Sequence, residues 1–202
     1  MRFSGSSVTS TRGARSAERR VVTMDTKSDT YAIARLVLSR IAHPVAIIGA
    51  AHDGERSCAT GTTMYVSLSP AMIAVAEHHG SRTTRLIRDS GQFSVSLLHD
   101  SQQELAAAAG KSAAGPDKFA TLRIPVAEPP EGLLAPAVAG SIAILWCRVA
   151  RSVETGDHLL FVGEVVAHHI DERKVDPLLR YRRRYMRSGH WTSEESPEGY
   201  PT

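Results

Sequence analysis

The chain has 202 residues, of which 42% are hydrophobic, enough for one domain with tails, and it contains no run of about 18 apolar residues to span a membrane. Its formal charge of +3 comes from arginines in residues 1–23 and 180–187, while the remainder carries −6, which argues against a nucleic-acid-binding face on the fold. The two cysteines form no Cys-x-x-Cys pair, which argues against a disulfide framework or zinc site, and without an apolar signal sequence we expect a cytoplasmic protein.

The N-terminal segment, residues 1–27, is rich in Ser, Thr, Arg and Gly without periodicity, which predicts a disordered tail. A transit peptide is the alternative interpretation. The folded domain is expected over residues 28–188, followed by a flexible tail at residues 189–202. Apolar residues at helical spacing predict a first helix over about residues 29–41, which Pro44 ends.

The segment PVAIIGAAHDGERSCATG, residues 44–61, predicts a β-hairpin because two strand-like runs flank an Asp-Gly turn at residues 53–54. Two further apolar runs, residues 71–77 and 93–98, predict strands. The first half of the domain is therefore expected to be mostly β.

Two short helices are predicted around these strands. The first begins with Ser81 as its N-cap and stops at Gly91. The second covers residues 101–112 and is expected to begin with a capping box, in which Ser101 is followed three residues later by Glu104. Both helices flank the predicted strands.

A Gly- and Pro-rich connector, residues 115–136, leads to two long strands at residues 141–153 and 158–170. Gly156-Asp157 joins them, and Gly at the first central position fits a type II′ turn. Both strands are apolar on both faces, which suits a barrel interior on one face and a covering helix or second subunit on the other. The predicted fold is mainly β with flanking helices.

The chemistry-bearing motifs of several large enzyme classes are missing. No Gly-x-Gly-x-x-Gly follows a strand, and neither a phosphate-loop lysine motif nor a Gly-x-Ser-x-Gly elbow occurs. Two hydroxyl-rich stretches remain, residues 59–70 and 80–87. In the second, free backbone N–H groups, the helix dipole and Arg82 together favour a phosphate. The alternative is an ordinary polar helix cap with a solvated arginine.

Other polar residues admit a structural and a functional interpretation. His158 follows the Gly-Asp turn and is either part of that turn or the rim of a site. Two pairs of adjacent histidines occur, His78-His79 and His168-His169. Adjacent side chains in a strand point to opposite faces, so neither pair forms a metal site by itself and we expect none. Arginines over residues 180–187 either form a solvated surface or attract nucleotide phosphates or an acidic partner.

Five segments carry a resemblance to a known family. They occur in the order and spacing seen in the flavin reductase-like family, and the similarity covers about residues 31–187. The segments are SCATGTTMYVSLSPAMIAVA, SRTTRLIRDSGQFSVSLL, DKF at 117–119, GDHLLFVGEVV and PLLRYRRRY.

The resemblance implies a FMN-binding split β-barrel that acts as an NAD(P)H:flavin oxidoreductase. Members of the family serve as reductase components of two-component flavin monooxygenases. The implied cofactor is FMN, with FAD as the alternative, and NADH or NADPH is the co-substrate that gives a hydride to the flavin. A homodimer with a transient monooxygenase partner, and neither nucleic acid nor membrane binding, is also expected.

The resemblance also implies the site residues. It implies that the flavin is contacted through backbone and hydroxyl groups by Ala59, Thr60, Gly61, Thr62 and Thr63. It implies that the flavin phosphate is bound by Ser81, Arg82, Thr83 and Thr84. His158 becomes a positioning residue near the isoalloxazine and the nicotinamide, and the remaining cofactor-binding candidates are Lys118, Phe119 and Tyr185. Lys118 and Phe119 follow a Gly-Pro turn, so they either close over a ligand or merely begin the next segment of the chain.

Two departures from the family pattern affect these expectations. Relatives often have Thr-Ala-Asn-Ser-Phe where this chain has Ala-Thr-Gly-Thr-Thr at residues 59–63, which removes an Asn amide and a Phe ring. Relatives commonly carry Gly at the position of Arg183. The first departure motivates a second hypothesis, a flavin- or haem-binding carrier or sensor on the same fold without turnover.

Overall fold

The computed structural model describes residues 27–111, 115–173 and 175–188. The expected tails at residues 1–27 and 189–202 lie outside the described residues, apart from Lys27, which begins the first helix. Across these ranges, no helix is long and apolar enough to cross a membrane.

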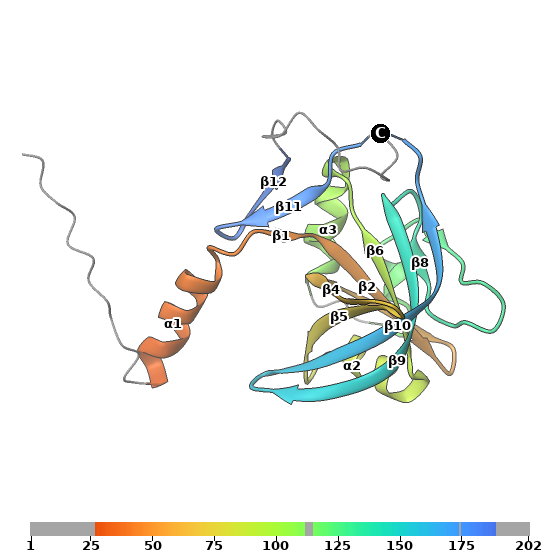
Figure 1. Ribbon diagram of the computed structural model, residues 1–202, viewed down its shortest axis with the longest axis horizontal. Coiled ribbons are helices and arrows are strands. Elements are labelled where there is room, and N and C mark those ends of the chain that lie inside the picture. Colours follow the sequence, from red (N-terminus) through yellow and green to blue (C-terminus); the bar gives the residue numbers. More distant parts are fainter. Residues whose placement is uncertain (1–26, 112–114, 174, 189–202) are drawn as a thin grey trace, which may run out of the picture.

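Seven antiparallel strands form the main sheet, which curls into a barrel (Figure 1). From one edge to the other they are β3 (Glu55–Gly61), β2 (Ala46–His52), β6 (Gln92–Leu97), β9 (Ala143–Thr155), β10 (His158–Ile170), β5 (Ala71–His78) and β4 (Thr63–Leu68). The edge strands β3 and β4 are consecutive in the chain, and only Thr62 separates them. The barrel is therefore split where β3 passes into β4. This mainly β fold with flanking helices confirms the sequence prediction.

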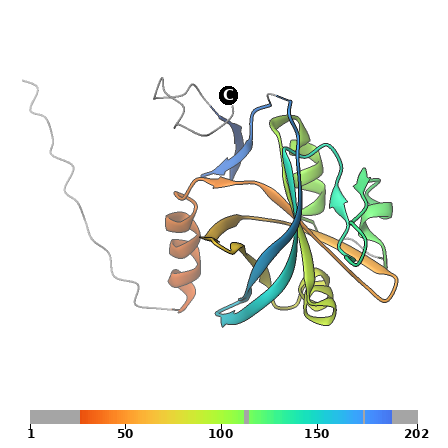
Figure 2. The same cartoon turned by 45° about the vertical axis from the view of Figure 1, so that its right-hand side comes forward.

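Short strands and helices surround the barrel. A three-stranded sheet joins β1 (His43–Pro44), β11 (Leu178–Tyr181) and β12 (Arg184–Arg187), and a two-stranded sheet joins β7 (Val126–Ala127) and β8 (Ala137–Val138). The helices are α1 (Lys27–Leu38), α2 (Arg82–Ser90), the 3₁₀ turn η1 (Asp100–Gln102), α3 (Gln103–Ala109) and α4 (Lys118–Thr121). Helix α1 stands beside the barrel in both Figure 1 and Figure 2.

The core consists of two main apolar clusters. The larger lies between α2 and the sheet and includes the fully buried rings of Phe93 and Phe161. The second lies beneath α3 and α4 and includes Phe119 and Leu178. Burial of this apolar surface dominates the folding free energy. The predicted flavin stretch at residues 59–63 runs from the end of β3, which contacts α3, to the start of β4 at the split of the barrel.

Two local predictions are confirmed because each depends on a few adjacent residues. Asp53 and Gly54 have φ values of +46° and +78°, the left-handed pair of a type I′ hairpin turn between β2 and β3. In α2 the Ser81 hydroxyl accepts from Thr84 N, and Gly91 ends the helix at φ +67°.

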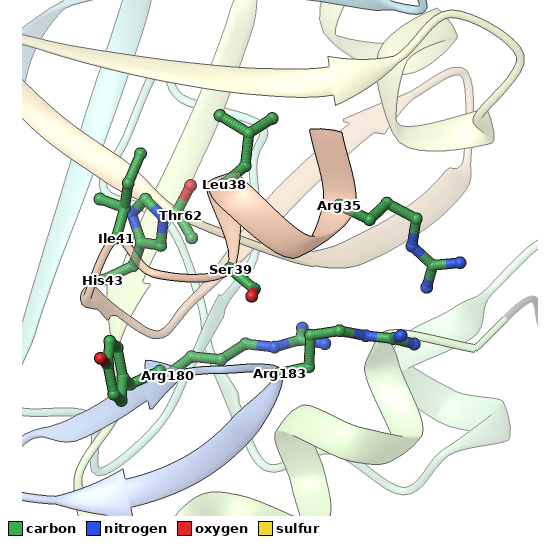
Figure 3. A pocket seen from close by; sticks show the side chains of 9 residues that line it. Arg35, Leu38, Ser39, Ile41, His43, Thr62, Arg180 and Arg183 are labelled. Carbon is green, nitrogen blue, oxygen red and sulfur yellow. The ribbon is translucent and has the colours of Figure 1, made fainter. Parts of the chain in front are cut away.

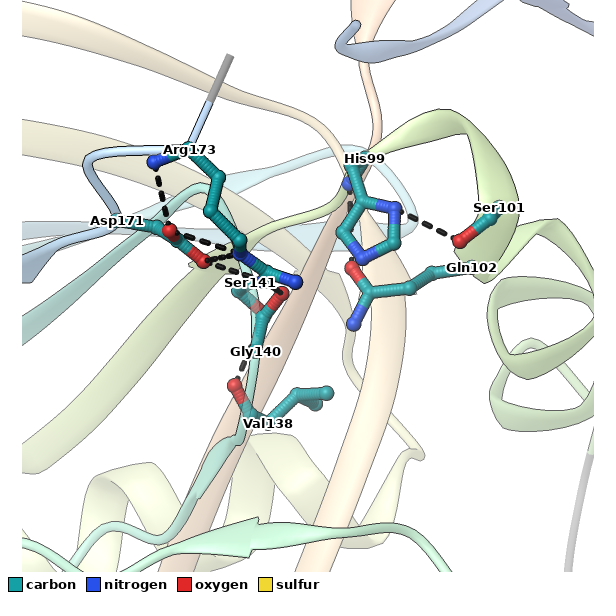
Figure 4. A network of polar contacts seen from close by, with 8 residues as sticks. All are labelled: His99, Ser101, Gln102, Val138, Gly140, Ser141, Asp171 and Arg173. Atoms are coloured by element: carbon teal, nitrogen blue, oxygen red, sulfur yellow. Dashed lines mark hydrogen bonds and ion pairs between the residues drawn. The ribbon is translucent and has the colours of Figure 1, made fainter. Parts of the chain in front are cut away.

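The predicted capping box at Ser101 is wrong. His99 is extended and the 3₁₀ turn already begins at Asp100, so Ser101 lies inside the first turn. Its hydroxyl is 2.9 Å from His99 Nδ1, and the backbone N–H of His99 donates to Gln102 Oε1 (Figure 4). The same figure shows Arg173 bound to Asp171 at the end of β10.

Strand β4 was not anticipated, and the first helix ends at Leu38 rather than near residue 41. β4 lies at the sheet edge with most side chains at the surface, so its sequence lacks the apolar alternation of a half-buried strand. The last turn of the expected helix instead leads into β1, which pairs with β11 near the C-terminus. That pairing is a long-range contact that local spacing does not reveal.

Candidate functional site

The stretch at residues 59–63 bridges the split of the barrel. The Thr60 hydroxyl donates to Ala106 O at 2.6 Å, and the Thr63 hydroxyl donates to Ala74 O at 3.0 Å. Both groups therefore fasten the strand ends to neighbouring elements. Thr62 is exposed, and its side chain lines a cavity. Of the three threonine hydroxyls, Thr62 is the one left at the surface for a ligand.

The N-terminus of α2 is a turn that is held together by hydrogen bonds of its own buried hydroxyl groups. The Thr84 hydroxyl donates to His78 O at 2.8 Å, and the Thr83 and Ser57 hydroxyls lie 3.1 Å apart. Thr83 and Thr84 are buried, so their side chains shape the loop. The backbone N–H groups of the first helical turn, at Arg82 and Thr83, have no partner within the helix. Such groups, with the helix dipole, favour an anion.

Arg82 supplies a positive charge at this helix end. Its Nε lies 3.7 Å from Glu55 Oε2 on the hairpin, and Arg85 binds the same oxygen at 2.7 Å. Because Arg85 makes the shorter contact, Glu55 stays paired when Arg82 turns toward a ligand. The expected phosphate residues thus divide into Arg82 with the backbone, which can contact an anion, and buried threonines, which hold the loop.

The turn between β9 and β10 lies directly beside this loop. Gly156 has a φ of +52°, whereas Asp157 is not among the described residues with positive φ, the combination of the predicted type II′ turn. The backbone N–H of His79 donates to Asp157 O at 3.2 Å. Two predicted site segments, far apart in sequence, are therefore neighbours in the fold.

His158 is held in a defined orientation at the surface. Its Nδ1 lies 2.7 Å from Asp157 Oδ1, and its ring meets His78 edge to face at 5.8 Å. The hydrogen bond to His158 lowers the pKa of the Asp157 carboxyl. His158 pairs with His78 across β10 and β5, so both rings lie on the outer face of the barrel.

Lys118 and Phe119 begin α4, which Asp117 caps by accepting from Ala120 N at 2.9 Å. Lys118 is buried and its Nζ donates to Ala109 O at 2.7 Å; burial is the main cause that lowers its pKa. Phe119 has no exposed surface and packs in the second core cluster. This placement favours the structural role, the start of a segment, over closure on a ligand.

Glu77 is a buried carboxylate beside the candidate site that the sequence analysis did not single out. It lies on β5, is 5% exposed, and its Oε1 has no hydrogen-bond partner in the described part of the chain. A Cβ placed on Gly61 would lie 3.2 Å from that oxygen, so the carboxyl reaches across to the flavin stretch. The signal that could have found it is a carboxylate at the end of the apolar run AMIAVAE, where a buried strand makes a perturbed pKa expected.

Burial raises the pKa of Glu77 to about 7, and the charge of Lys118 opposes that rise. Cys58, on β3 beside them, has its thiol pKa raised to about 12, chiefly by burial. Glu77 therefore titrates near neutral pH, while the thiol stays protonated. This group of three buried polar side chains underlies the stretch at residues 59–63.

Tyr185 lies on β12, half-buried against the second core cluster, with the Arg180 guanidinium 5.7 Å from its ring centroid. The turn before it, where relatives carry Gly, places Arg183 at φ +65°. The arginine thus adopts the backbone conformation that favours glycine.

Comparisons with known proteins agree on one family. Residues 38–189 match the flavin reductase like domain. The reductase subunit HsaB of a flavin-dependent monooxygenase from Mycobacterium tuberculosis is 31% identical over 75% of this chain and 79% of its own length. A flavin reductase (NADH) from Kitasatospora aureofaciens is 30% identical over 65% of each chain. Nitrilotriacetate monooxygenase component B from Mycobacterium thermoresistibile superposes with a TM-score of 0.71 at 28% identity, covering 87% of this chain and 97% of that one.

Proposed function

This chain belongs to the flavin reductase-like family, and from that premise we infer that it is an enzyme that reduces flavin with a reduced nicotinamide nucleotide. In finer detail, we propose FMN as its flavin, with FAD as the alternative, and NADH or NADPH as the donor. Reduced flavin then passes to a partner monooxygenase, because HsaB is the reductase subunit of a flavin-dependent monooxygenase. A cytoplasmic location is part of the proposal.

The observation that carries this function is the joining of three distant segments at one end of the barrel. The contact of Ser57 with Thr83 ties β3 to α2, and the bond from His79 N to Asp157 O ties the α2 loop to the β9–β10 turn. The flavin stretch, the phosphate loop and His158 are therefore parts of one rigid surface. Rigid placement of two reactants at reacting distance is the main demand of hydride transfer.

The residues of this surface fit a flavin. The N–H groups at the start of α2 and the Arg82 guanidinium suit its phosphate. The exposed Thr62 side chain, next to Gly61 and at the edge of a cavity, suits a ring edge that carries hydrogen-bonding groups. When bound, the flavin supplies the redox chemistry by accepting a hydride. The protein would bind and orient the flavin, and the contact with Asp157 fixes the orientation of the His158 ring for that role.

Oxidation of NADH and NADPH by the purified full chain, with FMN or FAD titrated, tests this proposal. Saturable turnover that depends on flavin concentration is the expected result. Absence of turnover together with tight flavin or haem binding would contradict it. That outcome would favour the carrier or sensor that the lost Asn and Phe side chains motivate.

We further propose a homodimer, because large apolar side chains are exposed on α1 and β4, which favours burial against a second copy. They are Val37 on α1, and Met64, Tyr65, Val66 and Leu68 on β4. Leu68, at 83% exposed, is the most exposed of them.

Light scattering after size exclusion is expected to give the mass of a dimer for the wild type. Leu68→Lys is expected to shift that mass toward the monomer. Leu134→Lys, which changes an exposed leucine in the connector, is the control and should not shift it. A wild-type monomer across micromolar concentrations would contradict the dimer.

Arg82→Ala is expected to weaken flavin binding about 10- to 100-fold, because it removes a charged partner of the phosphate. The rate of hydride transfer in the fully bound state should change much less, since Arg82 meets the phosphate and not the reacting ring. Fluorescence titration and stopped-flow reduction separate the two quantities. Arg88→Ala, at an exposed position on the same helix, is the matched control. Equal losses in affinity and rate would contradict the assignment.

His158→Ala is expected to slow flavin reduction about 10- to 100-fold while leaving flavin affinity mostly intact, because the ring orients reactants rather than holding the phosphate. Rapid reduction kinetics at saturating flavin measure the change. His169→Ala, at an exposed position on the same strand, should react like the wild type. An unchanged rate in the His158 variant would return this residue to a turn-only role.

A further inference from the structure

Two adjoining cavities open between α1 and the β11–β12 hairpin, beside the split of the barrel. The smaller, of about 270 Å³, is lined by Arg35, His43, Thr62, Arg180 and Arg183 among others. The larger, of about 510 Å³, shares Arg35 and Arg183 with it. Figure 3 shows Arg35 coming from the helix, and Arg180 and Arg183 coming from the hairpin on the opposite side. Thr62 connects this arginine pocket to the flavin stretch.

The arginine pocket carries uncompensated positive charge. Arg35, Arg180 and Arg183 line the smaller cavity, and Arg35, Arg40, Arg182 and Arg183 line the larger, while no Asp or Glu is among the described residues that line either one. Within the described ranges, none of these five arginines forms an ion pair. Arg82 and Arg85, by contrast, share a carboxylate at the phosphate loop. Unpaired charge that converges on a cavity attracts anions.

The hairpin turn holds its arginines in a costly backbone conformation. Arg182 and Arg183 have φ values of +49° and +65°, in the two central positions where Asn-Gly is preferred. Left-handed backbone disfavours any residue with a Cβ. Strain of this kind is tolerated at ligand sites, where the side chain matters more than local stability.

Tyrosines supply flat surfaces in the same region. Tyr181 lines the smaller cavity, and the Arg182 guanidinium lies 5.4 Å from its ring centroid. The hydrogen bond and charge of Arg182, with a smaller effect of Arg40, lower the pKa of the Tyr181 phenol. Tyr31, at the mouth of the larger cavity, has Arg35 over its ring at 5.4 Å. Stacked arginine and tyrosine planes suit an aromatic base next to a phosphate.

We propose that the arginine pocket binds the adenosine diphosphate end of a dinucleotide. The pyrophosphate meets the forked guanidinium groups, which match phosphate oxygens in pairs, and the adenine lies against the tyrosines. The proposal rests on the proposed function, since the dinucleotide is either the nicotinamide donor or FAD. Thr62 places the pocket beside the flavin stretch, so one molecule reaches both.

Calorimetric titration of the full chain with ADP tests the pocket without turnover. Arg180→Gln and Arg183→Gly are each expected to weaken ADP binding about tenfold. Arg184→Gln removes the same charge from an exposed position that lines neither cavity, so it should bind ADP like the wild type. No ADP binding by the wild type, or equal binding in all variants, would overturn the proposal.

Arg183→Gly separates recognition from folding. Glycine suits φ +65°, so the melting temperature is expected to stay unchanged or rise by about 2–4 °C while ADP binding weakens. A turn residue with a purely structural role would raise the melting temperature and leave ADP binding intact, which would contradict its place in the pocket.

Kinetics identify which dinucleotide occupies the pocket. If it holds the donor, the Arg180 and Arg183 variants raise KM for NADH or NADPH about tenfold with FMN as acceptor, and the Kd values of FMN and FAD stay equal to wild type. If it holds FAD, the variants raise the Kd of FAD and not that of FMN. Either result supports the proposal. If the variants keep the wild-type KM and Kd values, the proposal is overturned while the proposed function stays intact. If the wild-type protein binds ADP but does not turn over, the proposed function alone is contradicted.

Discussion

The free energy of unfolding of the wild-type protein is expected to fall by about 3 kcal/mol between about pH 4.5 and pH 7, and Glu77→Gln is expected to abolish this fall. The native state keeps the Glu77 proton until about pH 7, because burial raises its pKa, while the unfolded chain releases it near the ordinary glutamate pKa of 4.5. The native state therefore binds more protons in this window. The free energy of unfolding falls as pH rises through it.

Chemical denaturation of flavin-free protein at several pH values between 4 and 8 measures this effect. The variant and the wild type should be similar at the acidic end, and the variant should be more stable at pH 8, since Gln carries no buried charge. The charged group facing Glu77 is Lys118, which Arg82 faces in turn, while the Cys58 thiol beside them stays protonated. The pKa of Lys118 is lowered, so its contribution to stability changes with pH in the opposite direction. Parallel pH profiles for the two proteins would contradict the buried, unpaired carboxyl.

Gly49→Ala is expected to destabilise the protein by about 3 kcal/mol or more, lowering the melting temperature by about 10 °C. A Cβ at this position would overlap the carbonyl oxygen of Pro136 and lie 2.5 Å from Ser94 Oγ. These two groups are themselves hydrogen bonded at 2.6 Å and buried, so neither moves without losing a buried bond. β2 pairs with β3, and the strain would therefore reach the flavin stretch.

Thermal unfolding followed by circular dichroism measures the change. Gly110→Ala is the matched control, because its added Cβ meets Ala106 O and Thr60 at ordinary contact distances of 3.4–3.5 Å. Its stability should stay within about 0.5 kcal/mol of the wild type. A Gly49 variant as stable as this control would show that the approach of Pro136 to β2 is looser than the structure describes.

Local elements were predictable because their causes are local. Asp53-Gly54 and Ser81 with Gly91 specify a turn and a helix through hydrogen bonds and φ preferences of adjacent residues. The Ser101 capping box failed because the N-cap lies two residues earlier, at His99, and the 3₁₀ turn begins at Asp100. Edge strand β4 was missed because it buries too little to leave an apolar alternation.

The site divides in the same way. The stretch at residues 59–63, the loop at residues 81–84 and His158 were each visible as residue types in order along the chain. Their proximity was not, because it depends on the pairing of His158 with His78 and on the passage of the chain at Thr62 from one edge strand of the sheet to the other. Glu77 and the arginine pocket gain their meaning from neighbours more than a dozen residues away.

By itself, the sequence determined the mainly β composition, the turn and cap positions and the family, since these follow from residue types at fixed spacing. The tertiary structure alone decided which hydroxyls are exposed and which are hydrogen bonded within the fold. It also decided where, among the described residues, a carboxyl oxygen is buried without a partner, and which arginines line a common pocket. Such properties depend on burial and on distances between segments remote in sequence. Desolvation and electrostatic energies depend on those distances, and local spacing does not encode them.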